Sequence, residues 1–426
     1  MDKKLKLSQF NIEKMNDNKL LLFNTLSQGL LELDEENIEE YEKLKQGISE
    51  NQDLMNILSQ GSMLVPQNVE EIENIKLINN IIKFDKSSLN LTIAPTLECN
   101  FACTYCYEKG KRYNTMNEET IEAIVKYVEE KATDIQNLSI CWYGGEPLIQ
   151  LPIIETLTEK FKKICGADIK YNAIMVTNGY LLDVEKARKL KELSVDTLQI
   201  TLDGTKEIHD KRRFLVDKSG TFDEIINNVK ECCEVINISI RINLDKSNSN
   251  QSIQLLDLLE DPKLKNKVSF YVAQVDDINN TCSNTSCLND SEFSQVEIEF
   301  YKKAWERGLY RFSFPSFNAC FCGAITFNNY VIDPLGDLYK CWNTIGYKEM
   351  NVGNVFDGIK MNENLTRWIN YNQYNSKCSG CNVFPICNGG CPYHSLTAGE
   401  NKCRSFKYNH TDIIDLFYQQ KKNDKK

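Results

Sequence analysis

The run Cys99-Asn-Phe-Ala-Cys103-Thr-Tyr-Cys106 decides the fold predicted for this chain of 426 residues. It directly follows an apolar segment, Leu89-Asn-Leu-Thr-Ile-Ala94, which is typical of a buried strand. The three cysteines of this run can wrap one corner of a metal cluster, because thiolates are ligands of both iron–sulfur centres and structural zinc. Tyr105 precedes the third cysteine, where its ring is placed to pack beside a bound ligand.

The odd number of cysteines distinguishes two interpretations of this motif. A closed zinc site takes four protein ligands. A [4Fe-4S] cube held by three thiolates instead leaves one iron open for a substrate or cofactor. The motif alone does not exclude the other interpretation, a zinc knuckle whose fourth ligand lies elsewhere in the sequence.

The composition is that of a globular protein, with 42% hydrophobic residues, 26% charged residues and a formal net charge of −10. We expect no nucleic-acid partner, because phosphate binding needs clustered Lys and Arg. We also expect no membrane segment and no secretory signal, since no run approaches the ~20 apolar residues of a span. These features predict a cytoplasmic protein, in which thiols stay reduced. The 17 cysteines therefore indicate metal or cluster ligation.

Residues 86–310 alternate short β-rich runs with helical patterns. Strands are predicted at 89–94, 138–143, 172–177, 197–202, 237–243 and 268–274, and helices at 117–132, 150–164, 183–193, 222–234 and 250–260. Such alternation implies a parallel sheet. Six units predict an α/β fold, a partial (β/α)6 TIM barrel, with its site on the loops at the C-terminal strand ends. The cysteine triplet lies on the first of these loops.

Other predicted strand ends carry groups that could contact a cofactor. The second strand is followed by Gly144-Gly145-Glu146-Pro147, in which two glycines allow the backbone to approach a ligand closely. The later strand ends supply Thr177-Asn178-Gly179, Thr201-Leu-Asp203-Gly204 with His209-Asp-Lys-Arg212-Arg213, and finally Arg241 and Asn243. Alone, each of these fits an ordinary turn or a capped helix start. Their position after successive strands favours a common site.

The two flanks of the barrel differ in character. Residues 1–85 predict a small α+β domain with a hairpin at 19–24 and 29–33 and a helix capped by Asp34. From sequence, this domain is either a peptide-binding module or a packing extension. Residues 311–426 hold the densest cysteine pattern of the chain, which comprises Cys320, Cys322, Cys341, Cys378, Cys381, Cys387, Cys391 and Cys403.

Taken together, the motifs resemble those of the radical S-adenosylmethionine (radical SAM) enzymes over about 340 of the 426 residues. The resemblance implies that Cys99, Cys103 and Cys106 hold a [4Fe-4S] cluster whose open iron binds SAM. It further implies that Glu146 accepts from the SAM ammonium group and that Arg213 lies near the SAM carboxylate. The other implied cofactor contacts are Tyr105, Gly144, Gly145, Asn178, Thr201, Asp203 and Arg241.

The C-terminal pattern, Gly336 included, resembles the SPASM extension of radical SAM enzymes. The resemblance implies two auxiliary [4Fe-4S] clusters. The first would be held by Cys322, Cys341 and Cys391, with Cys320 as a possible fourth ligand, and the second by Cys378, Cys381, Cys387 and Cys403. A pair of interleaved zinc sites is the alternative. Cys282 and Cys287 either complete a cluster or contact substrate, or are two spare thiols of a loop, and the sequence leaves these alternatives open. Cys141, Cys165, Cys232 and Cys233 are expected to be small core residues.

Enzymes with this extension mostly modify peptides, and residues 1–85 resemble the winged-helix-like segments that hold a precursor's leader, a mode that adds an edge strand to a sheet. We therefore predict three [4Fe-4S] clusters, SAM, and an electron donor such as flavodoxin or ferredoxin. The predicted reaction forms Cys thioether cross-links in a ribosomal precursor peptide with a leader and a Cys-containing core.

Three other functions stay open from the sequence. A sulfatase maturase would form formylglycine, but such enzymes carry an Asp where this chain has Trp342. A peptide maturase could instead form carbon–carbon or ether cross-links. A scaffold that binds iron–sulfur clusters or zinc would have no catalytic role.

Overall fold

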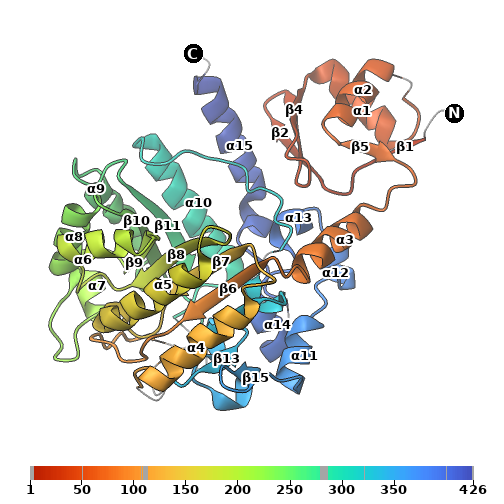
Figure 1. The fold of residues 1–426 in the computed structure, drawn as a ribbon. Helices are drawn as coiled ribbons and strands as arrows, with labels where there is room; N and C mark the ends of the chain where they lie inside the picture. The colour runs from red at the N-terminus through yellow and green to blue at the C-terminus, as the bar shows by residue number, and fades with distance from the viewer. Residues whose placement is uncertain are drawn as a thin grey trace. The chain divides into compact units, whose positions relative to one another are not determined.

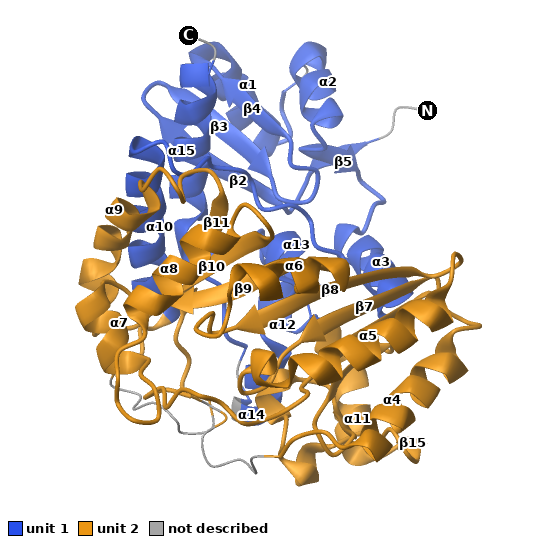
Figure 2. Cartoon of the chain, turned by 60° about the vertical axis from the view of Figure 1, so that its left-hand side comes forward, with its two compact units in different colours: residues 1–83, 290–322, 371–426 blue, residues 84–289, 323–370 orange. Residues whose placement is uncertain are grey.

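The computed structural model describes residues 4–49, 51–106, 108, 114–278, 286–320, 322–399 and 401–424. The chain divides into two compact units, each built from separate stretches of sequence (Figure 2). The first unit comprises residues 1–83, 290–322 and 371–426, and the second comprises 84–289 and 323–370. The predicted functional domains, 1–85, 86–310 and 311–426, stay predictions, because a compact unit reports packing and not function.

The second unit is organised around six parallel strands that are neighbours in chain order (Figure 1). These strands are β6 (Ser88–Ile93), β7 (Asn137–Trp142), β8 (Lys170–Thr177), β9 (Val195–Leu202), β10 (Asn237–Leu244) and β11 (Val268–Gln274). The helices between them are α4 (Glu118–Lys131), α5 (Leu151–Cys165), α6 (Val184–Glu192), α7 (Lys206–Arg212), α8 (Phe222–Cys232) and α9 (Leu255–Leu259). This arrangement confirms the predicted α/β fold with a mostly parallel sheet.

Alternation of side chains explains why these segments form strands. In β6, Leu89, Leu91 and Ile93 are at most 2% exposed, whereas the residues between them are half-buried. The same pattern recurs in β7, whose buried residues are Leu138, Ile140 and Trp142. A strand with this period buries one face in the core and leaves the other face partly accessible.

Beyond β6, the sheet continues with strands that the sequence analysis missed. The strand β12 (Asn329–Ile332) pairs in parallel with β6, and β13 (Asp337–Tyr339), β14 (Gly353–Asn354) and β15 (Gly358–Ile359) follow in antiparallel pairs. Each of these strands is too short to give a clear period. Gly336 makes the turn between β12 and β13 with φ +80°, and a Cβ there would lie 2.6 Å from Cγ2 of Val355. The helix α11 (Glu363–Ile369) completes this part.

The first unit contains the antiparallel sheet β2 (Asn11–Asn16), β3 (Lys19–Asn24) and β4 (Leu30–Leu33), which confirms the predicted hairpin. On one face of β3, Leu20 and Leu22 pack in a buried cluster with Tyr41 of α1 (Glu35–Lys45) and with Leu54 and Leu58 of α2 (Gln52–Gln60). Asp34 caps α1, as predicted, by accepting from the Asn37 amide.

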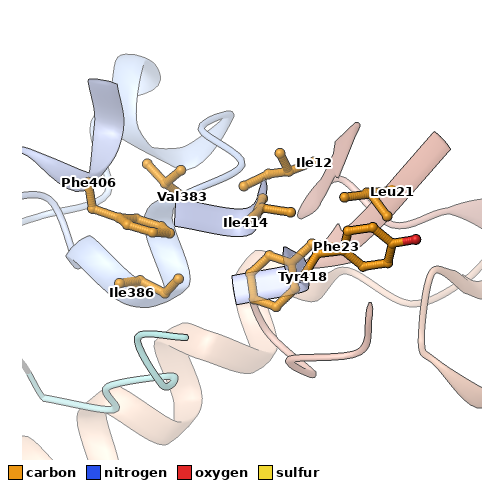
Figure 3. Close-up of a cluster of buried hydrophobic side chains, with 8 residues drawn as sticks. All are labelled: Ile12, Leu21, Phe23, Val383, Ile386, Phe406, Ile414 and Tyr418. Carbon is orange, nitrogen blue, oxygen red and sulfur yellow. The ribbon is translucent and has the colours of Figure 1, made fainter. Parts of the chain in front are cut away.

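The opposite face of this sheet is covered by the C-terminal helix α15 (Phe406–Asp424). Figure 3 shows Leu21 and Phe23 of β3 against Ile414 and Tyr418 of α15, in a cluster that also includes Ile12, Val383, Ile386 and Phe406. The remaining elements of the unit are β1 (Leu5–Leu7), β5 (Leu64–Pro66), α3 (Glu71–Lys83), α10 (Asp290–Glu306), α12 (Ser376–Ser379), α13 (Phe384–Cys387) and α14 (Pro392–Ala398). Among the described residues of both units, we find no helix with the length and apolarity needed to cross a membrane.

Candidate functional site

The cysteine run forms the loop after β6, and backbone hydrogen bonds hold it against the segment that follows α7. The Ala102 amide donates to the Phe214 carbonyl at 2.8 Å, and the Thr104 amide donates to the Arg212 carbonyl at 3.0 Å. Cys99, Cys103 and Cys106 are half-buried. These contacts shape one loop that carries all three thiols at the C-terminal edge of the parallel sheet.

In the absence of a ligand, the three groups are held as thiols. Burial raises the pKa of Cys99 to about 12 and that of Cys106 to about 11. Burial also raises the pKa of Cys103, while the neighbouring Arg213 lowers it. A bound metal cluster would replace these protons, because thiolates rather than thiols are metal ligands.

The two glycines of the Gly-Gly-Glu-Pro motif lie against the backbone of the cysteine loop. Gly144 has φ +116°, and a Cβ there would lie 2.3 Å from the Thr96 carbonyl oxygen. A Cβ on Gly145 would lie 2.2 Å from the Glu98 carbonyl oxygen. The expected need for close backbone approach is thus accounted for by packing within the chain, and contact of either glycine with a cofactor stays a prediction.

Glu146 is fully buried and links two strand ends. Its carboxylate accepts from the Leu148 amide at 3.0 Å, the Thr177 hydroxyl at 2.7 Å and the Asn178 amide at 2.7 Å. Burial raises the pKa of Glu146, and these three hydrogen bonds counteract that effect. The side chain of Asn178 then lies 3.9 Å from Cys99 Sγ, so Glu146 positions a residue that touches the triplet.

Tyr105 has its hydroxyl in a polar network. The hydroxyl donates to Asp203 Oδ1 at 2.8 Å and accepts from Arg213 Nη1 at 3.0 Å and from Asn243 Nδ2 at 3.2 Å. The Arg212 guanidinium lies 5.0 Å from the centre of the Tyr105 ring. Tyr105 therefore joins the cysteine loop to the ends of β9 and β10, a role that the sequence did not predict.

In the sequence, Arg212 was identified only as part of the run His209-Asp-Lys-Arg212-Arg213. In the structure its guanidinium group has three hydrogen-bond partners. Its Nε donates to Asp203 at 2.8 Å, and its Nη1 donates to Asp245 at 2.6 Å and to the Ser247 hydroxyl at 2.8 Å. Asp203 is completely buried and Asp245 nearly so. Charges this deep in a protein are found paired. The polar residues that follow β9 and β10 are the only feature of the sequence that could have predicted these ion pairs.

His209 was another residue whose position the sequence did not explain. It is fully buried, its Nδ1 accepts from the Asp203 amide at 3.3 Å, and its Nε2 lies 3.1 Å from the Thr221 hydroxyl. Burial and the neighbouring Arg213 lower the pKa of His209 to about 4. The neutral ring therefore holds Asp203 in place at ordinary pH.

Three buried donor atoms at the cysteine loop have no hydrogen-bond partner among the residues that the structure describes. They are Nε of Arg213, Nη2 of Arg212 and Nδ2 of Asn100. A buried donor without an acceptor costs free energy, so these three donors indicate that a bound ligand supplies the acceptor. The three thiols fit a [4Fe-4S] cluster. The guanidinium groups of Arg212 and Arg213, with their unpartnered donors, fit the carboxylate of SAM.

Thr201 of β9 and Arg241 of β10 are paired positions on the two neighbouring parallel strands. Arg241 Nε donates to Asn243 Oδ1 at 2.8 Å, and Asn243 in turn reaches the Tyr105 hydroxyl. Thr201 is 7% exposed. Both residues therefore lie on strands that contribute to the network around Tyr105, and their contact with a cofactor stays a prediction.

The first unit collects most of the C-terminal cysteines. Cys378 accepts from Asn401 Nδ2 at 3.2 Å, and Cys381 accepts from Lys407 Nζ at 3.2 Å. The Arg404 guanidinium interacts electrostatically with three further thiols, those of Cys387, Cys391 and Cys322. Cys403 interacts with the Tyr408 hydroxyl.

The other cysteines are distributed as follows. Cys320 is half-buried in the first unit beside Lys83, and burial raises the pKa of its thiol. Cys341 is half-buried in the second unit at the end of β13. Cys165, Cys232 and Cys233 are buried, as expected of core residues, whereas Cys141 and Cys287 are half-buried. Cys282 lies outside the described residues.

Within the described ranges, no group of three or more His, Cys, Asp or Glu side chains is arranged to hold a single metal ion. A [4Fe-4S] cube is larger than one ion and keeps its ligand sulfurs further apart. The ligand sets named for the three clusters stay predictions.

Comparison with protein families identifies the central part of the chain. Residues 93–259 match the family described as the radical SAM superfamily. This stretch begins at the end of β6, runs through the cysteine loop and ends at α9, so it contains the network around Tyr105.

Three relatives extend this match to different degrees. The Fe-coproporphyrin III synthase of Methanosarcina barkeri is 29% identical over 46% of this chain, and the chain spans only 47% of its length. The cysteine-type anaerobic sulfatase-maturating enzyme of Clostridium novyi is 26% identical over 75% of this chain and 94% of its own length. The radical SAM cyclopropyl synthase TigE of Paramaledivibacter caminithermalis is 24% identical over 97% of this chain and 94% of its own.

Solved structures have the same fold. The structure of anSMEcpe with bound AdoMet and Cp18Cys peptide has a TM-score of 0.62 at 21% identity, and covers 78% of this chain and 99% of its own. Streptococcus suis SuiB bound to the precursor peptide SuiA has a TM-score of 0.56 at 17% identity, and covers 94% and 98%.

Proposed function

Since residues 93–259 form a radical SAM domain and the chain is related to sulfatase maturases and radical SAM peptide maturases, we propose that it cross-links a ribosomal precursor peptide through Cys thioether bonds. The observation that carries the proposal is the half-buried cysteine loop with unpartnered donors of Arg212, Arg213 and Asn100 beside it. A cluster held there by Cys99, Cys103 and Cys106, with SAM, would supply a 5′-deoxyadenosyl radical for hydrogen-atom abstraction from substrate.

In this proposal each residue of the loop region has a stated task. Cys99, Cys103 and Cys106 ligate the cluster, and the Arg213 guanidinium, with its unpartnered Nε, binds the SAM carboxylate. Asn178 contacts the loop from the end of β8 and is positioned by Glu146, and Tyr105 of the loop itself is bonded to Asp203 after β9. Gly144, Gly145, Thr201, Asp203 and Arg241 complete the proposed cofactor contacts.

Two auxiliary clusters are part of the same proposal. Cys322, Cys341 and Cys391, with Cys320 as the possible fourth ligand, would hold the first, and Cys378, Cys381, Cys387 and Cys403 the second. Forming a thioether removes one hydrogen atom from a carbon, one proton from the Cys thiol and one electron. The hydrogen atom would go to the 5′-deoxyadenosyl radical that SAM supplies, the proton to solvent and the electron to a cluster held by one of these cysteine sets. A flavodoxin or ferredoxin would supply the electron that starts each turnover.

The N-terminal sheet is proposed to bind the leader of the precursor. Within the described residues, β2 and β4 are the edges of the sheet β2–β3–β4, since only β3 pairs with each of them. An edge strand offers unpaired amide and carbonyl groups to an extended peptide. The solved structures of anSMEcpe and SuiB each contain a bound peptide, which supports a peptide as the class of substrate.

A second candidate is carbon–carbon bond formation in a peptide. It is favoured by the match to a cyclopropyl synthase, which extends over 97% of this chain. Formylglycine formation is disfavoured, because Trp342 follows Cys341 and its ring stacks on Tyr143 with centroids 5.6 Å apart. An indole in this position cannot act as a carboxylate base.

Anaerobic reconstitution followed by iron and sulfide analysis and a SAM-cleavage assay with dithionite tests the proposal. We expect about twelve irons per chain, four for each of three clusters, together with 5′-deoxyadenosine. Replacing Cys99, Cys103 and Cys106 with Ala should abolish cleavage and leave the auxiliary iron. Zinc in place of iron, with no SAM cleavage, would refute the enzyme and leave a scaffold.

The bond type is tested by co-expression with a Cys-containing precursor peptide that carries a leader. A thioether product loses two hydrogens and its Cys no longer reacts with iodoacetamide. A carbon–carbon product also loses two hydrogens, but its Cys thiols stay reactive, and this result would favour the second candidate.

A further inference from the structure

The cysteines Cys378, Cys381, Cys387 and Cys403 are surrounded by hydrogen-bond donors. Asn401 and Lys407 each donate to a sulfur at 3.2 Å, to Cys378 and Cys381 respectively. The other two sulfurs are also contacted, since Cys387 accepts from the backbone amides of Gly389 and Arg404, and Cys403 bonds the Tyr408 side chain. Every sulfur of the set therefore has a donor.

Lys407 is the residue that donates a hydrogen bond to one of these sulfurs from a charged side chain, whereas Arg404 donates through its backbone amide and its guanidinium interacts only electrostatically with Cys387, Cys391 and Cys322. Lys407 lies in the first turn of α15, directly after Phe406, which is buried in the cluster against β3. Two residues further on, Asn409 donates to the Ser294 carbonyl at 3.2 Å and to Glu297 at 2.9 Å, both on α10. Packing on both sides fixes the start of the helix and with it the position of the Lys407 ammonium group.

A cation at this distance favours the more reduced state of an iron–sulfur cluster. One-electron reduction adds a negative charge to a group that already carries four thiolates, and hydrogen bonds to the sulfurs tune cluster potentials. A charge-assisted hydrogen bond is about twice as strong as a neutral one. The Lys407 contact should therefore raise the reduction potential more than the amide of Asn401 does.

We propose that Lys407 is a tuning residue, which raises the reduction potential of the cluster held by Cys378, Cys381, Cys387 and Cys403 and so makes that cluster the acceptor of the electron released by substrate oxidation. This inference rests on the proposed function, because it needs the four cysteines to bind a cluster. It assigns the electron-accepting role to the set that Lys407 contacts, because the Arg404 guanidinium interacts with thiols of both auxiliary sets and does not distinguish them.

The test is a redox titration followed by EPR, with dithionite as the source of electrons. Every protein carries Cys99→Ala, Cys103→Ala and Cys106→Ala, so that the SAM-binding cluster does not contribute. The signal that disappears on adding Cys381→Ala identifies the cluster in question. The variants are Lys407→Met, which removes charge and donor, Lys407→Gln, which removes charge alone, and Lys407→Arg, which keeps both. The matched control is Lys421→Met, an exposed position on the same helix.

We expect Lys407→Met to keep its iron and to titrate at a lower potential than the parent, Lys407→Gln to lie between them, and Lys407→Arg and Lys421→Met to match the parent. An unchanged midpoint in Lys407→Met with full iron content would overturn the inference and leave the proposed function intact. Loss of the cluster in both Lys407→Met and Lys407→Gln would also overturn it, since Lys407 would then be needed for binding. A parent protein without auxiliary iron would instead refute the proposed function.

Discussion

Arg212 and Arg213 are neighbours in the chain, and they serve different parts of the site. Arg212 donates through Nε and Nη1 to Asp203, Asp245 and Ser247, which leaves only its Nη2 without a partner among the described residues, and it holds together the ends of β9 and β10. The Arg213 side chain donates to the Tyr105 hydroxyl, and its Nε has no hydrogen-bond partner among the described residues. The charge of Arg212 is neutralised by its ion pairs with Asp203 and Asp245, whereas Arg213 has no ion pair among the described residues, so the Arg213 guanidinium is the one available to an anionic ligand.

We therefore predict that Arg213→Lys weakens SAM binding about tenfold or more, because a hydrogen bond to a charged group contributes about 1.5–3 kcal/mol. Lysine keeps the charge but lacks Nε. Binding can be measured by equilibrium dialysis with labelled SAM on reconstituted protein. Lys211→Ala, an exposed neighbour on α7, is the control and should bind like the parent. Parent-like affinity in Arg213→Lys would contradict the assignment.

Asp333 is a buried carboxyl group that gives the second unit a pH-dependent stability. Burial raises its pKa from 3.8 to about 6, against the opposing hydrogen bonds from the Asp337 and Leu335 amides and from Tyr339. Because the folded-state pKa is raised, the protonated form is favoured in the fold. The stabilisation is complete below pH 3.8 and is lost as pH rises through 6.

We predict that Asp333→Asn increases stability relative to the parent at pH 8 but not at pH 4, by at most about 3 kcal/mol. Asparagine stays neutral and its carbonyl can accept from the turn amides. Denaturant unfolding of both proteins at the two pH values gives the difference. A gain of the same size at both pH values would show that the effect does not come from titration of Asp333.

At the scale of elements, the loops after β6 and β7 form one packed unit through Gly144 and Gly145. We predict that Gly144→Ala abolishes retention of the loop cluster, because its Cβ would meet the Thr96 carbonyl at 2.3 Å and φ is +116°. The matched control is Gly166→Ala, where φ is +54° but no atom lies within 4 Å. Iron analysis of both variants measures the effect, and equal iron contents would contradict the prediction.

The carboxylate of Glu146 couples the loop after β7 to the end of β8. We predict that Glu146→Ala lowers the free energy of unfolding by about 1–3 kcal/mol for each buried amide left without an acceptor, those of Leu148 and Asn178. Thermal or urea unfolding measures this loss. Glu122→Ala removes an exposed ion pair with Lys160 and should cost under about 1 kcal/mol. A similar small loss in Glu146→Ala would mean that water replaces the carboxylate.

On the scale of the whole molecule, the two ends of the chain depend on each other. The sheet β2–β4 buries one face under α1 and α2 and the other under α15. The N-terminal 83 residues therefore lack half of their own core, since Leu21 and Phe23 pack on residues of α15.

We predict that a fragment of residues 1–83 shows no cooperative thermal unfolding, because removing α15 exposes one apolar face of the sheet. Mixing it with a fragment of residues 290–426 should restore a cooperative transition followed by circular dichroism. A cooperative transition in the isolated fragment would show that α1 and α2 alone provide enough core.

The sequence by itself determined the parallel α/β core and the position of the cysteine loop. Period-two strands, amphipathic helices and a spaced thiol motif are local features, and local physical chemistry fixes them. The predicted hairpin and the Asp34 cap are confirmed for the same reason.

Only the tertiary structure decided which groups meet across the sheet edge. The partners of Tyr105 come from β9, α7 and β10, and Glu146 joins residues about thirty positions apart. The pairing of β12 with β6 and of α15 with β3 joins segments that are further apart still. Such contacts depend on which strands pair and on which elements bury each apolar face. Both are long-range properties, so no local sequence pattern predicts them.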